Sequence, residues 1–349
     1  MSAAEAVIVA GGFGTRMLPL TERRPKHLLE VGGVPFLEHQ ITKLARAGIR
    51  HVVLATSYHA DQFMPVLGGG ERFGLRLTYV TEEVPLGTAG AIRNVADALD
   101  DEPDHPVVIL HGDVLSGHDL AAQLQDFEHS RGGASVDVSL HLVEVADARA
   151  FGCVPTDLQG RVTAFVEKSE APVTNQVNAG CYVFRRRVID LIPGGREVSV
   201  ERETFPLLVS EGAMVVGYVE TAYWRDVGSP QALVAASSDV VTGAAPTPAV
   251  APAGEAWVHP EAEVLGSVEA GSTVLAGARV ERGARVVGSV VMSGARVGAG
   301  ALVEESVLGQ RAVVGRQAVL RDVTLGDEAQ VSDDATPGPG TRVGGGERA

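Results

Sequence analysis

Over roughly the first two thirds of the chain, short apolar runs alternate with segments whose apolar residues have helical spacing. We predict strands at residues 6–10, 51–55, 75–81 and 107–110, and helices at residues 36–47, 88–99 and 231–240. Strands separated by helices form parallel β-α-β units with right-handed crossovers. This pattern predicts an α/β domain with a doubly wound, mostly parallel sheet. Further strands are expected within residues 135–186, including 161–168, and at 215–219.

The pattern changes after residues 241–255, which are rich in Pro, Ala and Gly and are predicted to form a linker. Beyond it, valines recur mostly six residues apart, at positions 264, 274, 280, 286, 291, 297, 303, 307, 313, 319 and 323. This hexapeptide repeat is typical of a left-handed β-helix, and we take Val274, Val290, Val307 and Val323 to be one coil apart. The predicted limits are 1–240 for the α/β domain, 256–332 for the β-helix and 333–349 for a flexible tail.

Composition narrows the function classes. With 349 residues, 45% apolar and 21% charged, the chain is long enough for two folded domains and too apolar to be disordered. A formal net charge of −15 argues against nucleic acids or anionic membranes as partners. No apolar run reaches the roughly 20 residues that cross a bilayer, and the first residues lack a signal-peptide pattern. Cys153 and Cys181 are the only cysteines, which favours reduced thiols and a cytoplasmic location.

The strongest chemical signal is the glycine-rich turn after the first predicted strand, AGGFGTRMLPLTERRPKHLL at residues 10–29. It is not a P-loop, because Thr15 and Arg16 stand where Lys and Ser or Thr are required. It is not a dinucleotide fingerprint, because Met17 replaces the third glycine. Glycines let backbone N–H groups approach an anion, Arg16 can hold phosphate oxygens, and Lys26 can reach them as a mobile charge. The turn therefore predicts a phosphate-binding loop.

A phosphate site in so acidic a protein must be a local basic exception, and the lysines help to locate it. Only Lys26, Lys43 and Lys168 stand among the 29 basic residues. Such scarcity marks places that need a compact point charge, or it reflects chance, and the sequence leaves both interpretations open for each lysine.

Two aspartates complete the pattern. Asp113 directly follows the apolar strand 107–110, and Asp226 lies in the segment WRDVG. Either aspartate alone is more often a turn or cap residue. In a chain that also has the glycine-rich turn, the two carboxylates suit Mg²⁺, which takes hard oxygen ligands and bridges phosphates.

The pattern G-G-x-G-T-R-x-x-P-L-T, followed by P-K, resembles the pyrophosphorylase loop of sugar nucleotidyltransferases, most closely the mannose-1-phosphate guanylyltransferases. The resemblance spans the chain apart from its tail and continues at 85–90, 112–113, 165–168, 178–180 and 224–228. It implies that residues 1–240 are the catalytic domain and that the nucleotide is bound by Gly11, Gly12, Gly14, Thr15, Arg16, Lys26, Gly87 and Thr88. It also implies sugar-phosphate contacts from Gly152, Glu167, Lys168 and Asn178, Mg²⁺ ligands at Asp113 and Asp226, and catalytic roles for Arg16, Lys26, Asp113 and Lys168.

The implied activity is the Mg²⁺-dependent reaction of GTP with mannose-1-phosphate, or with a related sugar- or cyclitol-1-phosphate, to release diphosphate. His111 stands where guanylyltransferases have Asn, and Met17-Leu18 and Ser169 also depart from the residues common in the family. Together these departures suggest a shifted acceptor, and valienol-1-phosphate of secondary metabolism is an alternative. A catalytically silent regulatory paralogue that binds nucleotide-sugars is the other alternative, although Lys26, Asp113 and Asp226 are present. A hexapeptide acyltransferase is disfavoured, because His259 is the only histidine of the repeat region. We expect the β-helix to mediate homo-oligomerisation.

Overall fold

The computed structural model describes residues 4–100, 102–149, 151–166 and 168–349. The chain divides into two units that do not follow the order of the sequence. The first unit holds Met1–Gly12 and Ile41–Trp224, and the second holds Phe13–Gln40 and Arg225–Ala349. This division differs from the predicted one, because the segment after the first strand belongs with the β-helix. The predicted limits at 240 and 255 remain sequence-based expectations.

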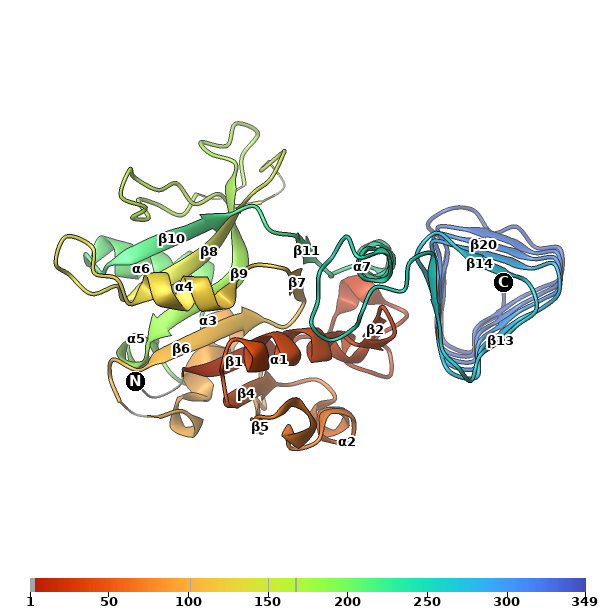
Figure 1. Cartoon of the computed structure of the whole chain (residues 1–349), viewed down its shortest axis with the longest axis horizontal. Coiled ribbons are helices and arrows are strands. Elements are labelled where there is room, and N and C mark those ends of the chain that lie inside the picture. Colours follow the sequence, from red (N-terminus) through yellow and green to blue (C-terminus); the bar gives the residue numbers. More distant parts are fainter. Residues whose placement is uncertain (1–3, 101, 150, 167) are drawn as a thin grey trace. The chain divides into compact units, whose positions relative to one another are not determined.

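The first unit is built on a seven-stranded sheet with the order β10-β8-β9-β6-β1-β4-β5 (Figure 1). Neighbouring strands are parallel except at β9, which runs antiparallel to β6 and β8. The predicted doubly wound, mostly parallel sheet is therefore confirmed. Its strands are β1 (Glu5–Ala10), β4 (His51–Thr56), β5 (Arg76–Thr81), β6 (Pro106–His111), β8 (Val138–Glu144), β9 (Gln176–Arg185) and β10 (Val215–Glu220). Two short strands, β7 (Val114–Ser116) and β11 (Trp224–Asp226), follow β6 and β10 along the chain.

Helices cover both faces of this sheet (Figure 1). Ala89 and Ile92 of α3 (Gly87–Asn94) join Val7, Val53 and Ile109 in one buried core, whereas α4 (Leu120–Phe127) packs on β8 and β9. The remaining helices are α1 (Phe36–Arg46), α2 (Phe63–Leu67), α5 (Arg186–Asp190) and α6 (Phe205–Ser210), with single turns η3 (Ala60–Gln62), η4 (Glu71–Phe73), η5 (Ala96–Ala98) and η6 (Val200–Thr204).

Two expected elements differ in the structure. The helix predicted for 88–99 ends at Asn94 and continues as the separate turn η5. Within the segment 161–168, the described residues 161–166 form isolated bridges in place of a strand. Cys153 bridges both Val166 and Val177, so this segment joins the sheet locally and does not run along a neighbouring strand.

In the second unit, the hairpin of β2 (Glu30–Val31) and β3 (Val34–Pro35) packs against α7 (Pro230–Thr242). Its turn is formed by Gly32 and Gly33, whose φ angles are 57° and 100°. A Cβ atom on Gly33 would lie 2.5 Å from the indole ring of Trp257, where the β-helix begins. Glycine is needed here both for the left-handed backbone and for this close approach.

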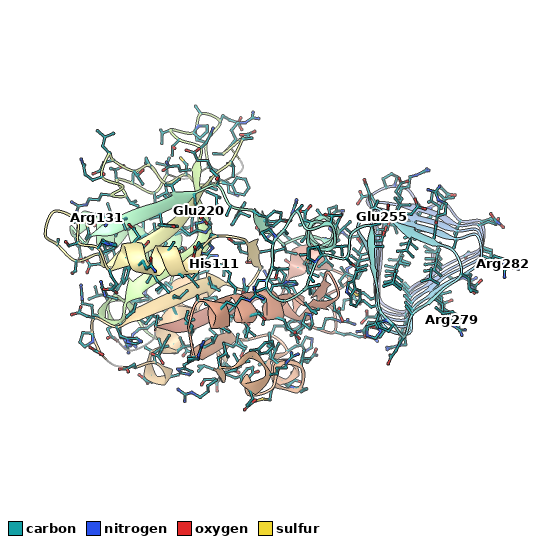
Figure 2. The ribbon with its side chains drawn as sticks, in the orientation of Figure 1. His111, Arg131, Glu220, Glu255, Arg279 and Arg282 are labelled. Atoms are coloured by element: carbon teal, nitrogen blue, oxygen red, sulfur yellow. The ribbon has the colours of Figure 1, made fainter. Side chains whose placement is uncertain are left out.

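The β-helix stacks its short strands in three parallel sheets, which is consistent with the predicted left-handed form (Figure 1). Its strands are β12 (Ala256–Val258), β13 (Glu263–Val264), β14 (Ser267–Glu269), β15 (Ser272–Val274), β16 (Arg279–Val280), β17 (Arg285–Val287), β18 (Val290–Val291), β19 (Arg296–Val297), β20 (Leu302–Glu304), β21 (Val307–Leu308), β22 (Val313–Val314), β23 (Val319–Arg321), β24 (Thr324–Leu325), β25 (Gln330–Val331) and β26 (Arg342–Val343). Arg279 and Arg282 point outward from the coils (Figure 2).

The inward column differs from the predicted one in the later coils. Val274 is in register with Val291, then with Leu308 and Leu325, and not with Val290, Val307 and Val323. Val313 is 36% exposed, while its neighbour Val314 is buried in the column. Counting valines alone missed this shift, because leucine takes the inward position in several coils.

Serine hydroxyls support the stack at one corner. The Oγ atoms of Ser272, Ser289 and Ser306 each accept a hydrogen bond from a backbone N–H one coil later, at 3.0–3.1 Å and a spacing of 17 residues. These buried N–H groups are thereby satisfied.

The segment 333–349 differs from the flexible tail that its Pro- and Gly-rich sequence suggested. Its strand β26 pairs with β24, and Val343, which is 5% exposed, belongs to the inward column. Among the described residues, none of the helices has the length and apolar content that a membrane crossing requires.

Candidate functional site

The second unit contains the basic part of the candidate site, in the Arg16 loop (residues 13–28). Gly14 adopts a left-handed conformation with φ 60°, and its carbonyl accepts hydrogen bonds from Met17 N at 2.8 Å and Thr21 Oγ1 at 3.0 Å. A Cβ atom on Gly14 would lie 3.4 Å from Cβ of Lys26. The structure thus brings Lys26, which begins the turn η2 (Lys26–Leu28), alongside the glycine.

Arg16 and Asp226 lie close together in the same unit. Nη2 of Arg16, in the turn η1 (Thr15–Met17), is 3.9 Å from Oδ2 of Asp226, and the two side chains are 68% and 40% exposed. A Cβ atom on Gly228 would overlap the guanidinium, so this glycine leaves room for the pair. Met17 is 1% exposed and anchors the loop in the core. An exposed cation beside an accessible carboxylate is suited to phosphate and to a metal ion.

Gly11 and Gly12 directly follow β1 in the first unit, where they lie close to Ser57 and Glu82, two residues that sequence reasoning missed. Gly12 N donates to Ser57 Oγ at 2.9 Å. A Cβ atom on Gly11 would lie 3.0 Å from Oε1 of Glu82 and 3.2 Å from Ser57 Oγ. Burial raises the pKa of Glu82, against the lowering effect of its hydrogen bonds to Leu86 and Ser57. Ser57 follows β4, the neighbour of β1, and Glu82 follows β5, the neighbour of β4. The order of the strands was therefore the signal that could have identified these two residues.

The predicted nucleotide-binding pair Gly87 and Thr88 is held by a distant segment. Gly87 has φ 70°, and a Cβ atom there would lie 2.7 Å from the carbonyl oxygen of Val198. Thr88 Oγ1 accepts a hydrogen bond from Val200 N at 2.9 Å. In the described structure, the acceptor role of the Thr88 hydroxyl therefore serves the fold.

Asn178 belongs to a hydrogen-bond network that reaches His111. Its Nδ2 atom donates to Tyr182 Oη and to Glu201 Oε1, both at 2.7 Å, and its Oδ1 atom accepts from Gly180 N at 3.0 Å. Tyr182 Oη lies 3.1 Å from His111 Nε2. Burial raises the pKa of the Tyr182 phenol, so the phenol keeps its proton. Asp113 follows two residues later, half-buried beyond the end of β6.

The predicted sugar-phosphate residues near 152–168 are only partly described. Gly152 is exposed, and a Cβ atom there would lie 3.1 Å from the carbonyl oxygen of Val166. Lys168 is exposed. Glu167 lies outside the described residues.

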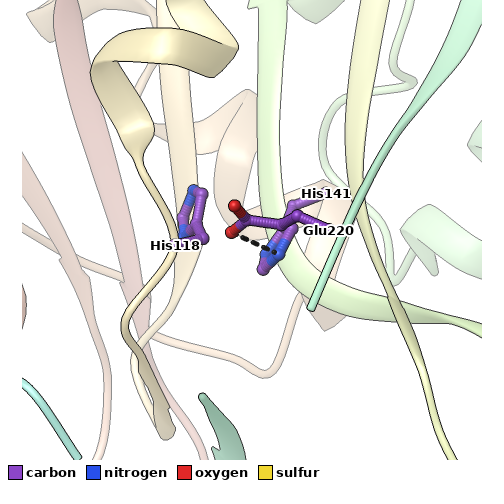
Figure 3. Close-up of side chains that lie close together, drawn as sticks. All are labelled: His118, His141 and Glu220. Carbon is purple, nitrogen blue, oxygen red and sulfur yellow. Dashed lines mark ion pairs between the residues drawn. The ribbon is translucent and has the colours of Figure 1, made fainter. Parts of the chain in front are cut away.

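Sequence reasoning missed a group of four residues, the histidine cluster, in which the two histidines are buried and the other two residues are half-buried. It consists of Lys43, His118, His141 and Glu220 (Figure 3 shows the last three). Lys43 Nζ donates to Ser116 O at 2.9 Å and to His118 Nδ1 at 2.7 Å. His141 Nε2 lies 3.3 Å from Glu220 Oε1. Burial lowers the pKa of Lys43 to about 8 and that of His141 to about 3, and it also lowers the pKa of His118.

The histidine cluster is a poor metal centre despite its ligand types. The two imidazoles are stacked, with centroids 4.0 Å apart and planes at 18°. A metal ion lies about 2 Å from each nitrogen and in the plane of each ring, which stacked rings cannot both satisfy. Both His118 nitrogens are also engaged, by Lys43 and by Gln123 Oε1 at 3.1 Å. We interpret the cluster as structural.

Comparison with known proteins identifies the scaffold. Residues 5–243 match the family model described as nucleotidyl transferase, and residues 253–336 match the GMPPB C-terminal domain. The chain belongs to the nucleotidyl transferase family. It is therefore an enzyme of the nucleotidyltransferase class, and the resemblance stated from its sequence is confirmed.

Relatives of this nucleotidyl transferase carry specific names. The mannose-1-phosphate guanylyltransferase of Mycobacterium tuberculosis is 51% identical over 284 residues, which cover 81% of this chain and 76% of that protein. The mannose-1-phosphate guanyltransferase of Saccharomyces cerevisiae is 36% identical over 230 residues, covering 65% of this chain and 62% of that protein. The chain thus spans less than two thirds of the fungal relative's length.

Solved structures confirm the fold over part of the chain. HddC from Yersinia pseudotuberculosis, also solved in complex with GMP-PN, is 26% identical with a TM-score of 0.57 and covers 68% of this chain and 99% of its own. A putative glucose-1-phosphate thymidylyltransferase from Bacillus anthracis has a TM-score of 0.60 at 24% identity, covering 68% of this chain and 94% of its own. The second likeness concerns the fold alone.

Proposed function

We propose that the protein is a mannose-1-phosphate guanylyltransferase, which converts GTP and mannose-1-phosphate into GDP-mannose and diphosphate. The observation that carries this proposal is the 51% identity with the mycobacterial enzyme over 81% of the chain. The local chemistry agrees with it, because the loop that contains Gly14 also carries two cationic side chains, Arg16 and Lys26, in an otherwise acidic protein.

In the proposed reaction, a phosphate oxygen of the sugar-1-phosphate attacks the α-phosphorus of GTP. A new P–O bond forms there, the bond to the α,β-bridging oxygen breaks, and diphosphate leaves with the negative charge. Arg16 and Lys26 stabilise this charge, and Lys168 orients the attacking phosphate. No general base is needed, since the attacking group is already anionic.

Mg²⁺ is the proposed cofactor, and Asp113 and Asp226 are its proposed protein ligands. Both are half-buried carboxylates, and such hard oxygens fit an ion that keeps several waters. Bound Mg²⁺ would neutralise charge on the triphosphate. Asp113 belongs to the first unit and Asp226 to the second, so their joint role stays a prediction.

Guanine is the proposed base, as the resemblance implies, and Glu82 is a candidate to contact it. Its carboxylate lies against Gly11 after the third strand of the β1-β4-β5 series. A carboxylate can accept the two neighbouring N–H groups of guanine, whereas adenine presents an acceptor at that edge. The remaining site predictions, Gly12, Thr15, Gly87, Thr88, Gly152, Glu167 and Asn178, stay as the resemblance implies them.

A screen of pyrophosphate release tests the function. GTP, ATP, UTP and dTTP are each paired with mannose-, glucose- and valienol-type 1-phosphates. We expect GTP with mannose-1-phosphate to exceed the other bases by at least about tenfold, and Glu82→Gln to narrow the gap between GTP and ATP. A preference for valienol-1-phosphate would assign the alternative acceptor. Nucleotide binding without pyrophosphate release from any pair would favour a silent regulatory paralogue.

Assembly and location are proposed with the function. We expect the β-helix to mediate homo-oligomerisation. Truncation after residue 250 should therefore lower the number of chains per particle, as judged from the mass in gel filtration relative to the mass of one chain. An unchanged number of chains per particle would contradict this. A cytoplasmic location agrees with Cys153 and Cys181, which are buried free thiols.

A further inference from the structure

The last coil of the β-helix (residues 327–345) contacts the Arg16 loop within the second unit. Nη1 of Arg342 donates to the carbonyl oxygens of Arg16 and Leu18, at 3.0 and 2.9 Å. Arg342 can reach them because it alternates with the inward Val343 on β26 and therefore faces outward. One guanidinium nitrogen thus bridges two carbonyls on either side of Met17.

Three further contacts join the same two segments. Gly345 N donates to Glu22 Oε2 at 3.2 Å, and a Cβ atom on Gly345 would lie 2.7 Å from that oxygen. Arg24 forms an ion pair and hydrogen bond with Asp327, and these side chains are 11% and 9% exposed. Arg23 Nη1 lies 3.5 Å from Glu328 Oε2. The Arg24–Asp327 pair is the best shielded from water, so it is the least screened by salt.

We propose that the last coil of the β-helix positions the Arg16 loop for phosphate binding and that Arg342 is the positioning residue. The guanidinium of Arg16 is largely exposed, so its location depends on where its backbone is held. Gly14 and Thr21 fix one side of that backbone, and Arg342 fixes the carbonyl of Arg16 itself. A group held in advance stabilises developing charge without paying for reorganisation during the reaction.

This inference rests on the proposed function, in which Arg16 binds the triphosphate. It adds that residues more than 300 positions later in the sequence determine how well the loop performs. Arg342 does not touch the substrate in this proposal, and it acts only through the backbone of residues 16–18.

The test compares Arg342→Met, which keeps the length of the side chain but has no donor, with Arg342→Lys, which keeps a charged donor. Arg348→Met is the matched control, because Arg348 is exposed and its Nε atom donates to Ser332 Oγ at 3.3 Å, within the β-helix. Arg342→Met should lower kcat/KM for GTP about tenfold, with KM for mannose-1-phosphate unchanged, and Arg342→Lys should recover part of the loss. Arg348→Met should behave as the parent. Equal kcat/KM for GTP in the parent and Arg342→Met would overturn the proposal.

Hydrogen exchange of the intact chain separates this inference from the proposed function. Amides of residues 15–22 should exchange at least about fivefold faster in Arg342→Met than in the parent, whether or not GTP is the substrate. Gly345→Ala, which displaces Glu22, should have a smaller effect in the same peptide. Unchanged exchange in both variants would refute the coupling. If the parent releases no pyrophosphate from any pair but exchange still rises, the proposed function fails while the structural coupling stands.

Discussion

The Arg16 loop and the histidine cluster both contain one of the chain's three lysines, but in opposite environments. Lys26 is half-buried beside Gly14, and Arg16 in the same loop is exposed. Lys43 is half-buried as well, but its ammonium group contacts His118, and desolvation lowers its pKa to about 8. A lysine that receives a phosphate must stay charged and accessible, whereas a buried lysine loses charge stabilisation and serves the fold. The environments of the two lysines therefore differ, and of the two we expect only Lys26 to bind phosphate.

The largest expected effect separates the two lysines by activity. Lys26→Ala should lower kcat for pyrophosphate release by about 10²–10³-fold, because it removes one charged donor from the triphosphate. Its free energy of unfolding should change by less than about 1 kcal/mol. Steady-state kinetics and denaturant unfolding measure the two quantities, with Lys26→Arg as the control that keeps the charge. A kcat within tenfold of the parent would place Lys26 outside the active site.

The second effect concerns acid stability. Buried His118 and His141 have pKa values below their ordinary 6.5 when folded, because burial disfavours the charged ring. Below that pH the unfolded chain takes up protons that the folded chain does not, so stability is full above about pH 6.5 and falls as the pH falls. For the two rings the loss between pH 6.5 and 5 is about 3 kcal/mol. The free energy of unfolding, measured at several pH values in this range, should depend less steeply on pH in His141→Gln than in the parent. The same pH dependence in both proteins would contradict the assignment.

The smallest effect again contrasts the lysines, now by stability. Lys43→Ala should lower the free energy of unfolding by about 2 kcal/mol, because Ser116 O and His118 Nδ1 lose a buried donor. Its kcat should stay within about threefold of the parent. Lys43→Met is the control, since it refills the space without restoring the donor. A loss of activity as large as that of Lys26→Ala would remove the distinction between the two regions.

Local pattern predicted the elements of this molecule better than their partners. Residues 51–55 and 107–110 lie within β4 and β6, because apolar runs of this length are buried in parallel sheets. Gly14 and Lys26 are brought together as the spacing of the turn suggested. The role of the Thr88 hydroxyl was not predictable, because its donor lies 112 residues away.

The tail shows a different limit. Its sequence begins DDATPGPG, which has the composition of a loop. The strand at Val343, which is in register with Leu325, was therefore not predicted. The histidine cluster was also hidden, because His118 and His141 are far apart in sequence and stack only through tertiary packing. In both cases, a long-range register that local composition does not encode decided the outcome.

The buried serines at one corner of the β-helix restrict which insertions and deletions its sequence can accept. Ser272, Ser289 and Ser306 repeat every 17 residues, and Val290 is in register with Val307. Excising residues 290–306 would join Ser289 to Val307 and leave a shorter helix with every hydroxyl still beneath an amide. The first and last coils deviate from this repeat, since Ala256 pairs with Ser272 and Thr324 pairs with Arg342. Insertions and deletions that keep the 17-residue repeat should therefore be tolerated best within the coils that carry the three serines.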